Sequence, residues 1–286
     1  MIATKIREGL GNQMFIYAAA RAMALRNDVP LVLDTHSCFE QGNPYGRKYG
    51  LHCFNIKYQS DRFRTLDYMC GNKVYGLSRR LGRNILFPKQ RFFVQGEDNA
   101  VFFPEMVESK NKEAFISGYW QNERYFNDYA DQIREDFSFV KKFPAATLRE
   151  LDKIKKQGDV PVALGVRLYQ ECDFDFGKMN KEYYLKAMEY IAERFPNAIF
   201  YAFSQVQDWV RENLDDGRYN IVYIEPKVGE DSAADDMMLF SSCKHHIISN
   251  STFYWWGAWL AEPNPEHIVV APKSWQTVPC ENWVKL

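Results

Sequence analysis

Hydrophobic and polar residues alternate in blocks near the N-terminus, and these blocks predict a strand, a helix and a second strand. An apolar run at residues 1–6 ends at two glycines, and apolar side chains then recur at helical spacing over 13–26. A second apolar run follows at 31–33 and ends at Asp34. Elements in this order predict a βαβ unit with parallel strands.

A second regular region begins near the middle of the chain. An apolar run at 115–120 predicts a strand, and a charged helical stretch at 141–158 predicts a link between two domains. Later apolar runs predict strands at 162–168, 198–203, 221–224, 246–249 and 268–271. The helices predicted between them cover residues 181–195, 206–214, 233–243 and 252–260.

Strands that alternate with helices in this way are typical of a doubly wound sheet, which binds ligands at the carboxyl ends of its strands. We therefore predict an α/β fold with two Rossmann-like, doubly wound domains that face a central cleft. The predicted boundary separates residues 1–155 from residues 156–286.

Composition narrows the class of protein. Hydrophobic residues make up 46% and charged residues 26%, which excludes a coiled coil, a collagen-like fibre and a disordered chain. The net charge of -1 argues against a dedicated nucleic-acid-binding protein. Aromatic residues reach 16%, which is compatible with side chains that stack on sugar rings. The six cysteines include no C-x-x-C pair, so their spacing predicts no metal site.

The chain starts without a secretory signal and contains no apolar run of the roughly 18 residues that a membrane span needs. We therefore expect a cytoplasmic protein. Its low net charge conceals a basic segment from Lys57 to Arg91, in which nine basic and two acidic residues give a charge of +7. One interpretation of this segment is a solvated helical face. The other is a surface that contacts phosphate groups, or a peripheral contact with the inner face of a membrane.

The first glycine turn resembles a dinucleotide-binding fingerprint. Gly9 and Gly11 have the spacing of its first two glycines, and Asp34 stands where such folds place a ribose-binding acid. Met14 replaces the third glycine, which argues against a nicotinamide site. The alternatives are a tight turn without a ligand and a loop that presents Asn12 and other polar groups to a substrate.

Two features of the second half indicate an anion site. Residues 249–252, Ser-Asn-Ser-Thr, precede a predicted helix, whose N-terminus offers unpaired N–H groups and the positive end of its dipole. A helix cap at Ser251 is the structural alternative. Arg167 leaves an apolar strand, where it is either a buried ion-pair partner or a bidentate phosphate clamp. The acids Glu171, Asp173 and Asp175 follow and are candidates for a general base.

Three motifs occur in chain order: Gly-Leu-Gly-Asn-Gln-Met-Phe at 9–15, Ser-Gly-Tyr-Trp-Gln at 117–121, and the segment 243–259 from Cys243 to Trp259. Together they resemble the alpha-1,2-fucosyltransferases of glycosyltransferase family 11. The resemblance implies a GT-B fold, GDP-L-fucose as donor, a galactoside as acceptor, inversion at the anomeric carbon and no required metal or cofactor. Two departures stand out: Gly165 and Leu168 flank Arg167 in place of the family's His-x-Arg-Arg-x-Asp pattern, and Gln205 follows Ser204 where the family has an acid.

The resemblance predicts transfer of L-fucose to the 2-hydroxyl of a terminal galactoside on an oligosaccharide that is lipid-linked. It implies an acceptor-side domain at 1–155 and a nucleotide-sugar-binding domain at 156–286. It assigns catalytic roles to Arg167 and Asn12. The predicted substrate-binding residues are Gly11, Gln13, Ser204, Asn250, Ser251, Thr252 and Trp256. Two alternatives are a transferase of the same fold with a different nucleotide sugar and a nucleotide- or nicotinamide-binding protein without transferase activity.

Overall fold

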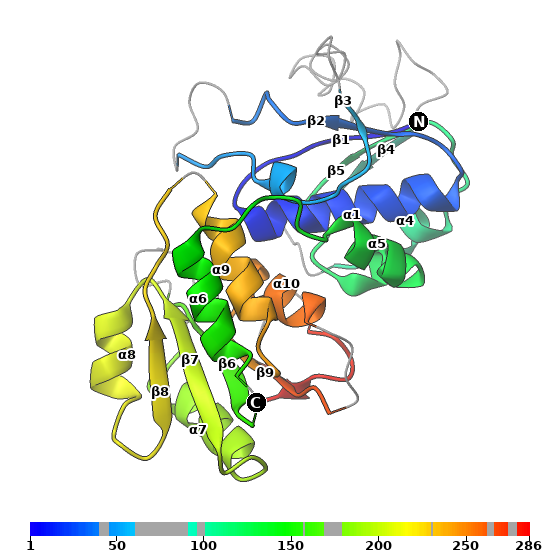
Figure 1. The fold of residues 1–286 in the computed structure, drawn as a ribbon. Coiled ribbons are helices and arrows are strands. Elements are labelled where there is room, and N and C mark those ends of the chain that lie inside the picture. The colour runs from blue at the N-terminus through cyan, green and yellow to red at the C-terminus, as the bar shows by residue number, and fades with distance from the viewer. Residues whose placement is uncertain are drawn as a thin grey trace. The chain divides into compact units, whose positions relative to one another are not determined.

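The computed structural model divides the chain into two compact units, Met1–Val140 and Lys141–Leu286 (Figure 1). The residues that the structure describes are 1–39, 46–60, 91–95, 101–156, 158–168, 179–229, 231–261, 266–273 and 279–286. Each unit is built on a parallel β-sheet with helices around it, as the sequence predicts.

In the N-terminal unit the described strands have the order β3-β2-β1-β5-β4, and every neighbouring pair is parallel. The strands are β1 (Ile2–Lys5), β2 (Leu31–Asp34), β3 (Gln59–Ser60), β4 (Arg91–Val94) and β5 (Ala114–Ser117). The helices are α1 (Leu10–Arg26), η1 (Leu51–Cys53), α4 (Pro104–Glu108), η2 (Glu123–Tyr125), η3 (Asn127–Tyr129) and α5 (Ala130–Asp136). The predicted N-terminal βαβ unit is confirmed.

Helix α1 is buried along nearly all of its length, which explains its Ala-rich and aromatic sequence. Its Tyr17 hydroxyl donates a hydrogen bond of 2.6 Å to the buried Asp136 carboxylate at the end of α5. Arg21 donates to the same carboxylate over 2.8 Å. The charge of Arg21 is therefore paired with that of the buried Asp136, as buried charges must be.

In the C-terminal unit the described strands have the order β11-β10-β9-β6-β7-β8, again all parallel. The strands are β6 (Val160–Val166), β7 (Ala198–Ser204), β8 (Asn220–Ile224), β9 (His245–Ile248), β10 (Val269–Ala271) and β11 (Val284–Lys285). The helices are α6 (Ala145–Ile154), α7 (Lys181–Ala192), α8 (Gln207–Asn213), α9 (Ser232–Ser241) and α10 (Thr252–Leu260). The predicted strands and helices of this half are confirmed, with small shifts at their ends.

Helices cover both faces of the C-terminal sheet. Val162 and Leu164 of β6 point to one face, where they form a core with Met188 and other residues of α7. Alternate residues of a strand point to opposite faces. Phe203 of β7 accordingly contacts Phe240 of α9 on the other face, with ring centroids 5.1 Å apart. This two-faced burial is what makes the strands read as continuous apolar runs in the sequence.

The N-terminal unit ends at Val140 and the C-terminal unit begins at Lys141, whereas the predicted domain boundary lies between residues 155 and 156. Helix α6 belongs to the C-terminal unit, because Lys141 just before it forms an ion pair of 2.8 Å with Asp235 of α9. Farther along α6, the Lys153 carbonyl accepts a hydrogen bond of 3.3 Å from the Tyr201 hydroxyl. Within the described parts of the chain, no helix is both long and apolar enough to cross a membrane.

Two consecutive histidines at the start of β9, His245 and His246, are completely buried. The His245 ring stacks on Phe195 at 4.3 Å between centroids, and its Nδ1 accepts a hydrogen bond of 3.2 Å from the Ile268 N–H. Burial lowers the pKa of His245 to about 4. Burial also lowers the pKa of His246 well below its usual value.

These histidines predict that the protein loses stability in mild acid. An unfolded histidine takes up a proton near pH 6.5, whereas folded His245 does so only near pH 4. Between these values the unfolded state binds more protons, so its free energy falls relative to the folded state as the pH drops. For His245 the slope approaches about 1.4 kcal/mol per pH unit between these two values. Urea denaturation at pH 7, 6 and 5 measures it.

A matched pair of variants isolates the effect. His245→Gln cannot take up the proton, so its stability should depend less on pH than that of the unmodified chain. His36→Gln changes an exposed histidine and should leave the slope as it is. Equal slopes for all three chains would contradict the assignment.

Candidate functional site

The C-terminal sheet has a topological switch point between β6 and β9. The chain runs from β6 outwards to β7 and β8, and then continues on the other side through β9, β10 and β11. Open α/β sheets bind ligands at the carboxyl ends of the strands at such a point. Here the Ser249 N–H donates to the Gly165 carbonyl over 3.1 Å, which joins the two strand ends.

The predicted anion-binding residues meet at this switch point. Arg167 follows β6 directly, and residues 249–251 connect β9 to α10, which begins at Thr252. The Tyr184 hydroxyl of α7 accepts from the Arg167 N–H over 3.2 Å and lies 3.4 Å from the Arg167 carbonyl, to which it donates. Tyr183 donates to the Ile248 carbonyl over 2.6 Å. Helix α7 therefore fixes the backbone at both strand ends, while the Arg167 side chain is half-buried.

The start of α10 has the features of an anion site. Ser251 is its N-cap residue, but no capping hydrogen bond from the Ser251 side chain occurs among the described residues. The Ser249 hydroxyl is fully buried and has no hydrogen-bond partner in the described part of the chain. A buried polar group without a partner costs free energy. The first N–H groups of a helix can bind a ligand oxygen, whereas the Ser249 hydroxyl is enclosed by protein atoms.

The other residues predicted for this half have different surroundings. Asn250 and Ser251 are more than nine-tenths buried, whereas Thr252 is half-buried. The Ser204 hydroxyl donates to the Val166 carbonyl and accepts from the Val206 N–H, both at 3.0 Å. These bonds make Ser204 a support of the strand ends, and its predicted contact with substrate stays a prediction.

Trp256 lies in the interior of the C-terminal unit. Its ring is completely buried and contacts those of Trp255 and Trp259, with centroids 5.1 and 5.2 Å away. These contacts support a packing role in α10. The predicted contact of Trp256 with substrate stays a prediction.

Helix α10 lies directly against β6 because Gly165 has no side chain. A Cβ atom on Gly165 would lie only 2.6 Å from the Tyr254 ring, and the Tyr254 hydroxyl donates to the Phe203 carbonyl over 2.8 Å. Gly257 makes the same kind of room for Phe240. Sequence reasoning missed these residues, although a glycine inside an apolar strand is a known sign of close approach.

The N-terminal sheet has its own switch point, between β1 and β5. Asn12, in the first turn of α1 after β1, lies at this edge and is half-buried. Its side-chain oxygen accepts a hydrogen bond of 2.9 Å from Gln121, which follows β5. Gly11 is buried beside Asn12 in the same turn. The structure thus joins the first two sequence motifs through an amide pair, which the sequence alone did not reveal.

Gln13 has no exposed surface and holds three backbone groups. Its amide nitrogen donates to the carbonyls of Glu8 and Lys48 at 2.7 and 2.8 Å. Its side-chain oxygen accepts from the Gly50 N–H at 2.9 Å. This geometry supports a role in shaping the loop, and the predicted contact of Gln13 with substrate stays a prediction.

Asp34, the acid of the fingerprint-like pattern, is engaged locally. Its carboxylate accepts hydrogen bonds of 3.0 Å from the N–H groups of His36 and Ser37, and Lys5 lies 3.7 Å away. Burial by itself would raise the pKa of Asp34, but the bonds from Ser37 and His36 lower it. A carboxylate used to close the turn after β2 argues against a role of Asp34 as a ribose-binding acid.

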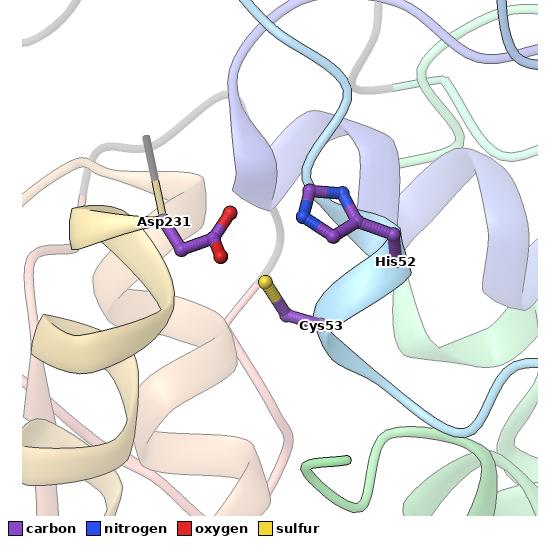
Figure 2. Close-up of side chains that lie close together, drawn as sticks. All are labelled: His52, Cys53 and Asp231. Atoms are coloured by element: carbon purple, nitrogen blue, oxygen red, sulfur yellow. The ribbon is translucent and has the colours of Figure 1, made fainter. Parts of the chain in front are cut away.

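Several predicted residues lie outside the part of the chain that the structure describes. The candidate bases Glu171, Asp173 and Asp175 lie outside the described residues, as do residues 61–90 of the basic segment. Figure 2 shows three potential metal ligands: His52 and Cys53 on η1 of the N-terminal unit, and Asp231 before α9 of the C-terminal unit. In the described residues of either unit taken alone, no three His, Cys, Asp or Glu side chains converge. Independence of metal stays a prediction.

Comparison with solved structures identifies the class of fold. A mutant of Arabidopsis thaliana FUT1 in complex with GDP superimposes on 94% of this chain and 70% of its own, with a TM-score of 0.55 and 13% identity. NodZ alpha-1,6-fucosyltransferase soaked with GDP-fucose covers 91% and 92%, with a TM-score of 0.50 and 14% identity. The fold is α/β of the GT-B type, as predicted.

Sequence comparison identifies the family. The chain belongs to glycosyl transferase family 11, whose profile matches residues 99–283. It is 27% identical to an alpha-1,2-colitosyltransferase of Escherichia coli over 100% of this chain and 99% of that protein. It is 28% identical to the O-antigen biosynthesis glycosyltransferase WbnK of Escherichia coli over 97% and 98%. A galactoside alpha-(1,2)-fucosyltransferase 1 of Aotus azarae is 28% identical over 51% of this chain and 42% of its own.

The contact between β6 and α10 gives a test of the architecture around the site. The Cβ atom of Gly165→Ala would lie 2.6 Å from the Tyr254 ring, so the ring would have to move away. Overpacking of this kind costs about 1–3 kcal/mol, which urea denaturation can measure. Gly9→Ala adds the same methyl group where no atom lies within 4 Å, and should cost less. Equal stability of the Gly165→Ala variant and the unmodified chain would contradict the tight contact.

Proposed function

We propose that this family 11 glycosyltransferase moves L-fucose from GDP-L-fucose to the 2-hydroxyl of a terminal galactoside, with inversion and without a metal. The observation that supports the donor site is the switch point of the C-terminal sheet, where Arg167 and the start of α10 come together beside the Ser249–Gly165 hydrogen bond. Full-length similarity to an alpha-1,2-glycosyltransferase supports the linkage.

The donor side of the mechanism is electrostatic. As the bond to the sugar breaks, negative charge gathers on the GDP leaving group while the anomeric carbon gains oxocarbenium character. The Arg167 guanidinium and the first N–H groups of α10 would bind the diphosphate and stabilise that charge. Because Arg167 and the helix dipole supply the positive potential, a divalent ion is not needed for the charge balance.

The acceptor side belongs, in this proposal, to the N-terminal unit. Asn12 would hold an acceptor or diphosphate oxygen, and Gln121 orients its amide through the 2.9 Å hydrogen bond. Asp173, Glu171 and Asp175 remain the candidates for the base that takes the acceptor proton. Similarity to WbnK, which is named for O-antigen biosynthesis, supports an acceptor that is a precursor of a surface polysaccharide. In this proposal the acceptor is lipid-linked.

GDP-colitose is a second candidate donor, because the alpha-1,2-colitosyltransferase of Escherichia coli is similar over the whole chain. Colitose is L-fucose without its 3-hydroxyl group, so one site could bind either sugar on the same nucleotide. The departures from the family pattern around Arg167 and after Ser204 lie at the donor end of the sheet, where they could alter this choice.

Donor and metal requirements can be tested together. The purified chain is incubated with lactose and GDP-L-fucose, GDP-colitose or UDP-galactose, and the product linkage is read by NMR. We expect a fucosyl product with an alpha-1,2 linkage and undiminished activity in excess EDTA. Transfer only from GDP-colitose would favour the second donor, and loss of activity in EDTA would contradict metal independence. Thermal stabilisation by NADH but by none of the nucleotide sugars would contradict a transferase.

The role of Arg167 can be tested by substitution. Arg167→Ala should lower kcat by about 100- to 1000-fold, as loss of one charge-stabilising donor does in comparable sites. Arg167→Lys keeps the charge but not the bidentate geometry, so it should lose less. Arg218→Ala removes an exposed arginine of the same unit and serves as the control. Near-normal turnover of folded Arg167→Ala protein would refute the assignment.

A further inference from the structure

Strained backbone occurs at both strand ends of the N-terminal switch point. Among the described residues, three that are not glycine have a positive φ: Glu8 at 67°, Asp28 at 51° and Trp120 at 54°. Asp28 lies in the exposed turn after α1. Glu8 and Trp120 instead follow β1 and β5, the two strands that flank the switch point. Side chains disfavour this left-handed conformation, so a glycine would suit both positions better.

Buried amides hold both strained residues in place. The Glu8 carbonyl accepts a hydrogen bond of 2.7 Å from Gln13. The Trp120 N–H donates to the side-chain oxygen of Gln95 over 2.9 Å. These two hydrogen bonds therefore fix the strained backbone of Glu8 and Trp120. Strain that a structure maintains in this way is a reason to look for a function of the side chain.

The Glu8 side chain belongs to a small polar cluster at this edge. Glu8, Arg7 and Tyr119 are all half-buried, and the Arg7 guanidinium lies 4.6 Å from the centroid of the Tyr119 ring. Burial raises the pKa of the Tyr119 hydroxyl, Arg7 lowers it, and the Glu8 carboxylate raises it through its charge and a side-chain hydrogen bond. The contact of Arg7 with Tyr119 links the segments that follow β1 and β5, next to Glu8.

A carboxylate at this edge suits a sugar hydroxyl, because a carboxylate group offers several acceptor sites for hydrogen bonds. Hydrogen bonds to a charged acceptor are stronger than those between neutral groups. The Asn12–Gln121 amide pair lies at the same switch point, after the same two strands. Carboxylate and amide side chains together match the several hydroxyl groups of a monosaccharide.

We propose that Glu8 binds the acceptor: its carboxylate accepts a hydrogen bond from the 3-, 4- or 6-hydroxyl of the galactose that receives the transferred sugar. Arg7 and Tyr119 lie beside Glu8, after the same two strands. The inference rests on the proposed transferase function and adds to it a residue that discriminates among acceptors.

The backbone strain makes a sharp experiment possible. Glu8→Gly removes the carboxylate and also relieves the positive φ, so the variant should be at least as stable as the unmodified chain. Its KM for lactose should rise by about 10- to 100-fold, as expected for loss of a hydrogen bond to a charged group. Its KM for the donor should stay within about twofold. Glu8→Gln keeps a neutral acceptor oxygen and should show a smaller rise.

Two controls complete the design. Asp28→Gly relieves the same kind of strain in an exposed turn, so it should leave both KM values unchanged. Lactose analogues that lack the 3-, 4- or 6-hydroxyl of the galactose should include one that is poor for the unmodified chain. That analogue should be no worse than lactose for Glu8→Gly, because the partner of the missing hydroxyl is already gone.

The outcomes separate this inference from the function on which it rests. If the unmodified chain transfers the sugar and Glu8→Gly has an unchanged KM for lactose, the inference is wrong and the function stands. A rise in the donor KM instead of the acceptor KM also overturns it. If the unmodified chain transfers no sugar to any galactoside from any donor tested, the proposed function fails and the inference fails with it.

Discussion

The structure depends on one constraint that both units share: the chain changes direction beside the first strand of each parallel sheet. All strands of such a sheet end at the same edge, so two strand ends that are far apart in the sequence become neighbours there. In the C-terminal unit these are the ends of β6 and β9, and in the N-terminal unit those of β1 and β5. Every residue to which we assign chemistry follows one of these four strands.

At each of these edges the polar residues divide into two groups. The side chains of Gln13 and Gln95 hydrogen-bond to backbone groups, and the Ser204 side chain does the same in the other unit. Asn12 and Arg167 stay half-buried beside them. The first group makes the edge rigid. Residues of the second group on a rigid edge therefore lose less conformational entropy when a ligand binds.

The sequence predicts the fold well because its signal is periodic and strong. Buried parallel strands are apolar throughout, and the helices between them are bounded by polar turns, so the C-terminal strands and helices fall where the pattern places them. Helix α6 was harder to assign to a unit, since its exposed Leu148 and its many charges resemble a linker. Its contacts with α9 come from residues distant in the sequence, which periodicity does not register.

The site was predictable only in part, because residue type does not reveal direction. Asn12 and Gln13 are adjacent amides of the same motif, yet one lies at the edge and the other is fully buried. Asp34 occupies the position of a ribose-binding acid, but the turn that follows it uses its carboxylate. The sequence gives no sign of Glu8, because what distinguishes this residue is its positive φ angle and not a motif.

The contact of Tyr254 with the bare backbone of Gly165 has an evolutionary consequence. A larger residue at position 165 can be tolerated only if position 254 becomes smaller or its helix moves, so the two positions are not free to drift independently. Homologous chains should therefore show correlated substitutions at this pair, although 89 positions separate them. Such a covariation would reflect the packing of α10 against β6, independently of any activity.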